Sequence, residues 1–424
     1  MNILFVTRDP PWPPMGGAGL RAYHFIRALG QRHRVSLICY ATVRQELEMR
    51  RAPVFWQCAT HAVRPPPARN PLERAMETLS SAVPDVVQRH ASTSMAHVVG
   101  RVLASEQWDV VHLVGLEMAS AIFPNYQDVL AEGRSKLVLD VLNVEHLLQS
   151  QASAVARRQL STLPVGVYGW LQSRKLKRYE AMVYRQATDV VAVSPEDRVT
   201  LERILPGSRI TLVPNGVDTQ RYQPRETAGE DSPVVHEGER KQAELLFTGT
   251  MDYRPNVDAA QWFVREVLPQ IMASTPEARV TLAGRNPTSA VCNLAGQHVQ
   301  VTGQIQDDLS YFQKASVYVL PMRFGGGSRL KLLQAMACGL PIVTTTAGAA
   351  GVAVKHDEHV WIGDTPEAFA KAVSELLANK GMARRLGAAA RILALEYDWS
   401  MSTQLLEDLY ANSPQRPFTG DPPA

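Results

Sequence analysis

The chain has 424 residues, which at roughly 100–200 residues per domain indicates two or three domains. Hydrophobic residues make up 45% and charged residues 20%, so global disorder is excluded. The formal net charge of +3 excludes the broad basic surface of a nucleic-acid-binding protein. The four cysteines lie far apart without a Cys-x-x-Cys pair, which argues against a zinc site or a disulfide framework and fits the cytoplasm.

Short apolar runs alternate with helical patterns in the first half of the chain. A strand at residues 3–7, a helix at 20–29 and a strand at 34–40 form a β-α-β unit of a parallel sheet. We expect no signal peptide, because no basic leader or cleavage site accompanies the first strand. No apolar stretch approaches the roughly 18 residues of a membrane span. Further strands are predicted at residues 109–114, 136–141, 189–193 and 210–213.

The composition changes at residues 225–242, which are polar and charged and which we interpret as a linker. The alternation of strand and helix then begins again. Strands are predicted at residues 243–249, 278–283, 299–302, 317–320, 341–344 and 359–362, and helices at 256–272, 309–314, 330–338, 366–379 and 382–397.

This repeated alternation predicts the α/β class, with two doubly wound Rossmann-like domains that bind ligands at the carboxyl ends of their strands and in an inter-domain cleft. We expect the first domain at residues 1–224 and the second at 243–396. A C-terminal helix at residues 397–412 is expected to pack back on the first domain, and residues 413–424 are expected to form a loose tail.

Residues 163–178 read LPVGVYGWLQSRKLKR, an apolar and aromatic stretch followed by basic residues. The favoured interpretation is a core helix with a solvated basic face. The alternative is a peripheral contact with a membrane, in which apolar side chains enter the lipid and cations meet phosphates.

The most specific motif is LPMRFGGGSRLKLLQAMACGLPIVTT at residues 320–345. The glycines at 325–327 allow backbone N–H groups to approach an anion closely, and the start of the next helix adds partial positive charge. Arg329 and Lys331 bring full charges to the same place. A diphosphate fits this pattern, whereas the alternative is a glycine-rich turn beside a solvated basic pair.

This motif resembles the donor site of the retaining glycosyltransferases of family four, which have the GT-B fold. Further segments are similar to the family's motifs and follow its order along nearly the whole chain: PMGGAGLRAYHFIRAL at residues 14–29, ITLVPNGVDTQRYQP at 210–224, LFTGTMDYRPNVDAAQWF at 246–263 and VTGQIQDDLSYFQKASVYVLP at 301–321. The resemblance implies that a sugar is transferred from a nucleotide-diphosphate donor to a glycan or lipid-linked acceptor, in cell-surface polysaccharide or glycolipid assembly.

The resemblance also assigns site residues. Donor-binding residues are expected at Gly16, Gly17, Gly249, Thr250, Arg254, Gly303, Ile305, Gly325, Gly326, Gly327, Ser328, Arg329, Lys331 and Gln334. Arg329 and Lys331 are also expected to be catalytic, because with the helix dipole they would stabilise charge on the leaving diphosphate. Arg21 is expected to reach an acceptor or a phosphate.

Several positions depart from the family's pattern. Thr250 stands where members often have an arginine on the diphosphate, so Arg254 or Arg329 is expected to replace that cation. Gly326 and Gln334 stand where the family commonly has two glutamates. The amide of Gln334 can still accept a hydrogen bond from a ribose hydroxyl, although more weakly than a carboxylate.

In the first domain, the family often has a histidine after the strand predicted at residues 136–141. Here we expect Asn143 and Glu145 to face the donor sugar as catalytic residues.

No Asp-x-Asp motif occurs in the chain, so we expect neither a metal nor any other cofactor besides the nucleotide sugar that serves as substrate. The enzyme is expected in the cytoplasm or at the inner face of the cell membrane. Two other functions remain open. One is a nucleotide-sugar epimerase or phosphorylase on the same scaffold, and the other is a non-catalytic nucleotide-sugar-binding protein, which needs only the phosphate cradle.

Overall fold

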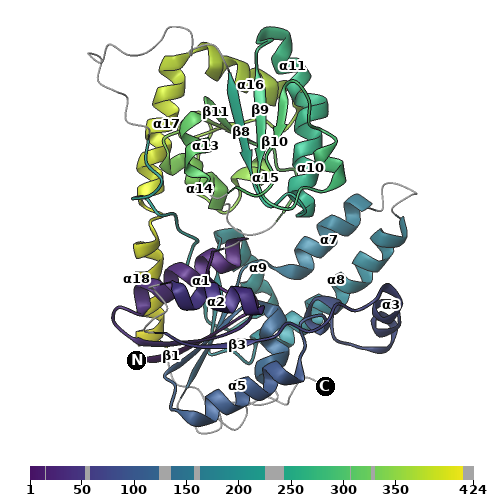
Figure 1. Ribbon diagram of the computed structural model, residues 1–424, viewed down its shortest axis with the longest axis vertical. Coiled ribbons are helices and arrows are strands. Elements are labelled where there is room, and N and C mark those ends of the chain that lie inside the picture. Colours follow the sequence, from purple (N-terminus) through teal and green to yellow (C-terminus); the bar gives the residue numbers. More distant parts are fainter. Residues whose placement is uncertain are drawn as a thin grey trace. The chain divides into compact units, whose positions relative to one another are not determined.

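The computed structural model describes residues 1–14, 16–52, 58–123, 135–156, 163–224, 243–305, 307–325 and 330–413. The chain divides into two compact units, one formed by Met1–Pro214 with Ser402–Ala424 and the other by Asn215–Met401 (Figure 1). Each unit is built on one parallel sheet with helices on its faces, which confirms the predicted pair of α/β sheets.

The first unit contains a seven-stranded sheet in the order β3-β2-β1-β4-β5-β6-β7. Its strands are β1 (Asn2–Thr7), β2 (Arg34–Tyr40), β3 (Ala59–Val63), β4 (Val110–Val114), β5 (Lys136–Val141), β6 (Asp189–Ala192) and β7 (Ile210–Leu212). Its helices are α1 (Gly16–Leu29), α2 (Val43–Arg51), α3 (Pro71–Ser80), α4 (Asp85–Gln88), α5 (Thr93–Ser105), the 3-10 turn η2 (Leu116–Met118), α7 (Glu145–Ala156), α8 (Leu163–Tyr184), α9 (Pro195–Ile204) and, from Ser402 onward, α18 (Trp399–Asn412).

The second unit contains a six-stranded sheet in the order β10-β9-β8-β11-β12-β13. Its strands are β8 (Glu244–Thr248), β9 (Arg279–Ala283), β10 (Val299–Val301), β11 (Val317–Leu320), β12 (Ile342–Thr344) and β13 (Trp361–Ile362). Its helices are α10 (Arg254–Trp262), the π-helical turn η4 (Phe263–Val267), α11 (Leu268–Ser274), α12 (Ser289–Cys292), α13 (Leu309–Lys314), α14 (Leu330–Ala337), α15 (Thr346–Ala349), α16 (Pro366–Ala378) and α17 (Lys380–Leu395).

Strand β3 is the described strand that the sequence did not predict. Its sequence, ATHAV, interrupts the apolar residues with Thr60 and His61. It pairs only with β2 at the edge of the sheet, so most of its side chains stay partly exposed. An edge strand therefore lacks the continuous apolar run by which the buried strands were identified.

The compact units divide at Pro214, ahead of the expected end of the first domain at residue 224. The segment after Pro214 belongs to the second unit, where Val217 forms a parallel bridge with Asp398. The expected linker, residues 225–242, and the tail from residue 414 onward lie outside the described residues. Ser413, the first residue of the tail expected at residues 413–424, is buried and donates to the carbonyl of Leu409, so this residue is not loose.

Arg21 on α1 is completely buried, which corrects the expectation that it reaches an acceptor. Its Nε lies 2.6 Å from Asp140 Oδ2 on β5, and a terminal nitrogen lies 3.1 Å from Oδ1. The guanidinium also donates to the carbonyls of Val213 and Pro214, at 2.9 and 3.1 Å, and lies over the ring of Phe25. These contacts enclose the arginine within the fold, away from the surface.

The network continues from Asp140 to the C-terminal helix. His112 on β4 places Nε2 3.4 Å from the Asp140 carboxylate, and its Nδ1 lies 2.7 Å from the hydroxyl of Tyr410 on α18. Burial by itself would raise the pKa of Asp140, but Arg21 and His112 outweigh it and hold this pKa below its usual value. The carboxylate therefore stays charged, and α1, β4, β5 and α18 share one buried polar network.

Replacing Arg21 with methionine is expected to destabilise the protein by about 3–5 kcal/mol, because the buried Asp140 carboxylate loses its counter-charge. The measurement is thermal and urea unfolding. Arg27→Met, an exposed arginine on the same helix, is the matched control and should change stability by less than about 0.5 kcal/mol. The double variant Arg21→Met/Asp140→Leu should recover much of the loss. If Arg21→Met were as stable as its control Arg27→Met, the role assigned to the ion pair of Arg21 and Asp140 would be contradicted.

Candidate functional site

Two glycine turns touch at the carboxyl edge of the second sheet. Gly249 follows β8, and Gly284 follows β9 with a φ of +151°. A Cβ on Gly284 would lie 1.7 Å from the carbonyl oxygen of Gly249, so no side chain fits there. The amide of Gly249 donates to Ala283 at 3.0 Å, and the amide of Met251 donates to Arg285 at 2.8 Å. The two turns therefore form one continuous backbone floor where parallel sheets bind their ligands.

Lys331, in the first turn of α14, holds its ammonium against this floor. Its Nζ donates to Asn256 Oδ1 at 2.6 Å and lies 4.8 Å from the centre of the Phe247 ring. A Cβ on Gly249 would come within 3.0 Å of Nζ, so the glycine leaves room for the charge. Asn256 in turn donates to the carbonyl of Thr250 at 2.9 Å. A positive charge is thus fixed at the edge where an anionic ligand is expected.

A second cation at this edge was missed by the sequence analysis. Arg285 follows Gly284, and its Nε lies 3.5 Å from the hydroxyl of Thr250. The signal was present as a Gly-Arg pair directly after the strand predicted at residues 278–283. Arg254, one of the two expected substitutes for the missing arginine, is exposed at the start of α10 and pairs with no described carboxylate. Arg285 therefore joins Arg254 as a candidate for the phosphate contact.

Four residues of the expected donor site lie outside the described residues: Gly326, Gly327, Ser328 and Arg329. Gly325, just before them, follows β11 with a φ of 135°. Gly303 follows β10 with a φ of 68° and open space beside its Cα, and Ile305 packs in part against the core. The contacts of these three residues with the donor stay predictions.

Gln334 lies three residues after Lys331 on α14, so the two side chains share one face of the helix. Its Nε2 donates to the hydroxyl of Tyr222 at 2.7 Å, and this hydroxyl lies 2.9 Å from both carboxylate oxygens of Asp308. The contact of Gln334 with a ribose, which the resemblance implied, stays a prediction.

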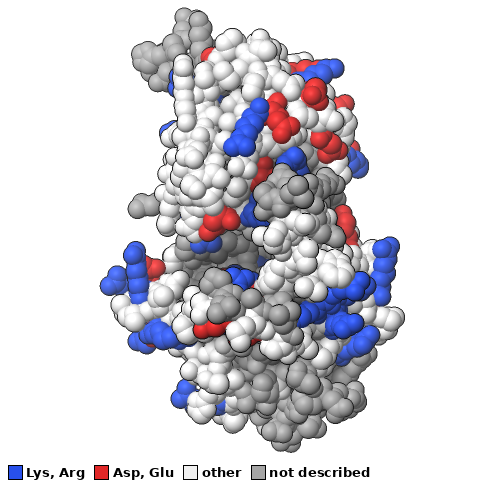
Figure 2. Space-filling model, turned by 90° about the vertical axis from the view of Figure 1, so that its right-hand side faces the viewer, with Lys and Arg blue, Asp and Glu red and all other residues white. Residues whose placement is uncertain are grey.

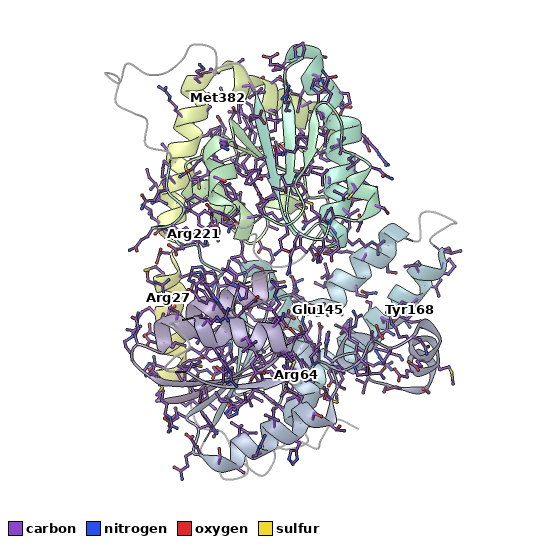
Figure 3. All side chains as sticks on the ribbon, in the orientation of Figure 1. Arg27, Arg64, Glu145, Tyr168, Arg221 and Met382 are labelled. Atoms are coloured by element: carbon purple, nitrogen blue, oxygen red, sulfur yellow. The ribbon has the colours of Figure 1, made fainter. Side chains whose placement is uncertain are left out.

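A second group of side chains gathers at the carboxyl edge of the first sheet. Arg8 follows β1, Glu117 follows β4 and Glu145 follows β5, and these strands are neighbours. Arg8 pairs with Glu117 at 3.2 Å. Figure 3 labels Glu145, which begins α7. We call Glu117, Glu145 and Glu180 of α8 the glutamate cluster.

The position of Glu145 within the glutamate cluster raises the pKa of its carboxyl group. Burial raises its pKa to about 8, and the charges of Glu117 and Glu180 act in the same direction. Arg8 and a hydrogen bond with Asn143 oppose this shift without cancelling it. The carboxyl group of Glu145 therefore carries its proton at neutral pH and can donate a hydrogen bond. The structure thus brings the two expected residues, Asn143 and Glu145, into contact.

Glu117 and Glu180 were not predicted. Glu117 lies three residues after the strand predicted at 109–114, so its place at the sheet edge was readable from the sequence. Glu180 lies within a long helix and is completely buried. It accepts hydrogen bonds from the ring of His146 at 2.5 Å and from its backbone amide at 3.1 Å, which fastens the start of α7 to α8.

Gly16 and Gly17 are exposed at the start of α1, on the same side of the first sheet as the glutamate cluster. Their backbone amides are among the first of the helix, where they have no partner within it. Anions bind readily at such a position. Their contact with a donor stays a prediction.

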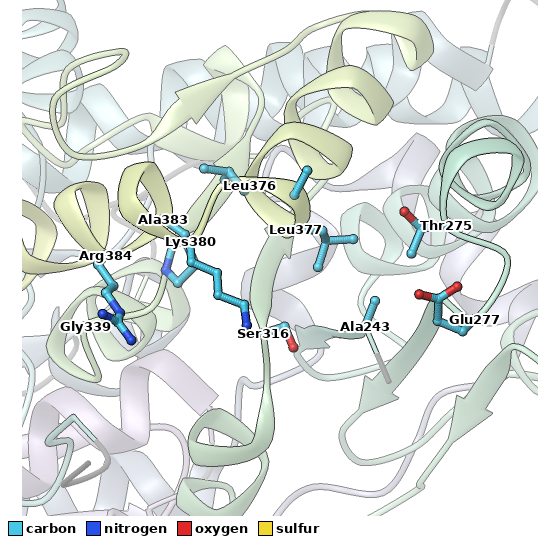
Figure 4. A pocket seen from close by; sticks show the side chains of 12 residues that line it. Ala243, Thr275, Glu277, Ser316, Gly339, Leu376, Leu377, Lys380, Ala383 and Arg384 are labelled. Atoms are coloured by element: carbon cyan, nitrogen blue, oxygen red, sulfur yellow. The ribbon is translucent and has the colours of Figure 1, made fainter. Parts of the chain in front are cut away.

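Among the residues that the structure describes, no group of three or more His, Cys, Asp or Glu side chains lies close enough to hold a metal ion. A hollow of about 540 Å³ opens beside Ala243, Ser316 and Pro341, next to α16 and α17 (Figure 4). These residues precede β8, β11 and β12, so the hollow lies at the amino edge, away from the turns described above.

The free energy of unfolding should depend on pH through Glu145. Because folding raises the pKa of Glu145 from 4.5 to about 8, its contribution to stability is complete below pH 4.5 and is lost as the pH rises towards 8. Glu145→Gln cannot ionise and should lack this fall, which reaches at most about 1.4 kcal/mol per pH unit. Chemical denaturation at a series of pH values measures it. Glu196→Gln, an exposed glutamate on α9, is the control, and parallel curves for wild type and Glu145→Gln would refute the shift.

Comparisons with known proteins agree with this architecture. The family described as "Glycosyl transferases group 1" matches residues 242–379, and "Glycosyltransferase Family 4" matches residues 146–221. A GDP-mannose-dependent monoacylated alpha-(1-6)-phosphatidylinositol monomannoside mannosyltransferase of Corynebacterium glutamicum is 26% identical over 54% of this chain and 64% of its own length. A phosphatidyl-myo-inositol mannosyltransferase of Mycobacterium tuberculosis is 26% identical over 48% of this chain and 54% of its own. The chain thus spans between half and two thirds of these relatives.

Solved structures share the fold over nearly the whole chain. A sucrose-phosphate synthase from Thermosynechococcus elongatus has a TM-score of 0.69 at 17% identity and covers 97% of this chain and 98% of its own. The Anabaena protein HepE, in complex with UDP and glucose, has a TM-score of 0.59 at 15% identity and covers 97% and 99%. At such low identity these likenesses concern the fold alone.

Proposed function

We propose that this chain, which belongs to the family-four glycosyltransferases and has the GT-B fold, is a retaining enzyme that transfers a sugar from a nucleotide-diphosphate donor. The observation that carries the proposal is the ammonium of Lys331, held over the Gly249 turn at the carboxyl edge of the second sheet. The relative described as GDP-mannose-dependent and the complex of HepE with UDP support a nucleotide donor.

The second unit supplies the groups that would hold the diphosphate. Lys331 and Arg285 offer full positive charges beside a backbone floor that no side chain obstructs. As the sugar leaves, negative charge grows on the diphosphate, and fixed cations stabilise it without reorganising. The proposal therefore includes a reaction that needs no metal ion, with Arg329 as a further cation from the glycine motif.

The first unit supplies hydrogen-bonding groups suited to a sugar. The protonated carboxyl group of Glu145 donates, and Asn143 offers an amide that both donates and accepts. A neutral carboxyl group also avoids repelling a negatively charged donor. We assign these two residues to the sugar, as direct contacts in the reaction.

The acceptor belongs to the proposal as well. The mannosyltransferase relatives are named for phosphatidylinositol substrates, which supports a lipid-linked acceptor, or a glycan, in cell-surface polysaccharide or glycolipid assembly in the cytoplasm. Isolation of a sugar–acceptor product after incubation with a nucleotide sugar tests transfer itself. Conversion of the donor without such a product would favour an epimerase or phosphorylase, and binding without conversion a non-catalytic protein.

Lys331→Ala is expected to weaken the binding of nucleoside diphosphates by roughly tenfold to a hundredfold, the scale of hydrogen bonds to charged groups. Calorimetric titration with ADP, GDP and UDP measures the affinity. Lys314→Ala removes an exposed lysine from α13 of the same unit and should leave the affinity unchanged. An equal affinity of wild type and Lys331→Ala would remove this lysine from the donor site.

Turnover should persist in EDTA, because Lys331, Arg285 and Arg329 take the place of a divalent ion at the diphosphate. The measurement is the rate at which nucleoside diphosphate is released from a nucleotide sugar that the enzyme accepts, before and after EDTA is added. Loss of turnover that manganese or magnesium restores would overturn the metal-independent part of the proposal.

A further inference from the structure

Helix α8 exposes apolar and basic side chains along one continuous face. Seven of the exposed residues recur with helical spacing and form one stripe, opposite buried residues such as Gln172, Leu176 and Tyr179. We call this stripe the α8 face, and it consists of Leu163, Val167, Trp170, Leu171, Arg174, Lys177 and Arg178.

The amino-terminal half of the α8 face is apolar although it is open to solvent. The exposed fractions are 40% for Leu163, 46% for Val167, 38% for Trp170 and 36% for Leu171. Such residues occur singly on many surfaces, but a run of them on one helix marks an interaction surface. Residues 163–178 thus bury one side and expose basic residues, as the favoured interpretation expected, whereas the exposed apolar residues fit the alternative of a membrane contact.

The carboxyl-terminal half of the α8 face is basic. Arg174, Lys177 and Arg178 are exposed, and the guanidinium of Arg174 lies 4.3 Å from the centre of the Trp170 ring. Lys175 points to another side of the helix and bonds to the carbonyl of Ser81 at 2.6 Å. Figure 2 faces the side on which α7 and α8 lie in Figure 1, and lysine and arginine side chains gather at the right of its lower half.

The buried side of α8 explains why the helix stays in place. Gln172 accepts a hydrogen bond from the backbone amide of Asp85 at 3.0 Å, and Glu180 holds His146. Leu176 and Val183 enter the core of the unit. The α8 face is therefore presented by a helix whose opposite side is fixed, so that it need not fold on binding.

We propose that the α8 face docks the enzyme on the surface of an anionic lipid bilayer. The apolar half enters the boundary between headgroups and acyl chains, and the basic half lies on lipid phosphates. The apolar half and the basic half follow one another along the helix, as the acyl-chain boundary and the lipid phosphates do across the bilayer surface. A purely apolar protein partner would not require the basic half. None of the described helices has the length and apolar character of a membrane span.

The test is sedimentation of the full-length protein with vesicles of phosphatidylcholine alone or of phosphatidylcholine mixed with phosphatidylglycerol. We expect binding to the mixed vesicles that weakens with added salt. Reversing Arg174, Lys177 and Arg178 to glutamate should lower the affinity by at least about fivefold for each side chain. Val167→Ser/Leu171→Ser should lower it by about tenfold or more.

The matched control reverses Arg203, Arg265 and Lys314, which are exposed elsewhere, and so changes the net charge by the same amount. This control should bind like the wild type, and circular dichroism checks that every variant is folded. No binding to mixed vesicles, or equal losses in the two charge-reversal variants, would overturn the proposal. A concentration-dependent dimer that Val167→Ser/Leu171→Ser abolishes would instead assign the α8 face to a second copy of the chain. Vesicle binding needs no sugar donor, so its failure leaves the proposed transferase activity untouched.

Discussion

The ion pair between Arg21 and Asp140 is the constraint on which the first unit depends. Both side chains are completely buried, and removing two charges from water costs several kcal/mol for each ion. The structure offsets this cost with two contacts between the side chains and with the carbonyls of Val213 and Pro214. The pair and these two carbonyls come from α1, β5 and the segment after β7, so the pair fixes three distant segments at once.

The same pair also positions the candidate site without touching it. Helix α1 begins at Gly16, and β5 leads directly to Asn143 and Glu145. A shift of Arg21 would move both segments, because each is held through the guanidinium. Arg21 therefore acts on the site through the backbone, and a loss of activity in its variants would not identify it as a ligand-binding residue.

Sequence patterns predicted the secondary-structure elements that can be recognised from their own residues. Buried parallel strands read as apolar runs, so all strands except β3 were found, and the turn at Gly249 followed from the end of one of them. Glu117 and Arg285 sit just after predicted strands and were within reach of the same reasoning. Arg21 was not, because its partner lies 119 residues away and only the folded sheet brings the two together. The raised pKa of Glu145 also depends on the folded structure, since Glu117, Glu180 and Arg8 come from three different parts of the chain.

Helix α8 joins the two proposals made for this protein. Its buried side contributes Glu180 to the glutamate cluster, and its exposed side carries Trp170 and Leu171. From Leu171 to Glu180 the helix rises by roughly 14 Å at 1.5 Å per residue. Consider an acceptor whose lipid part lies in the membrane at the α8 face. A short sugar or phosphate segment is then enough for it to extend along the helix as far as Glu180. Because α8 is fixed to α7 through His146, docking would also hold Glu145 at a constant height above the lipid surface.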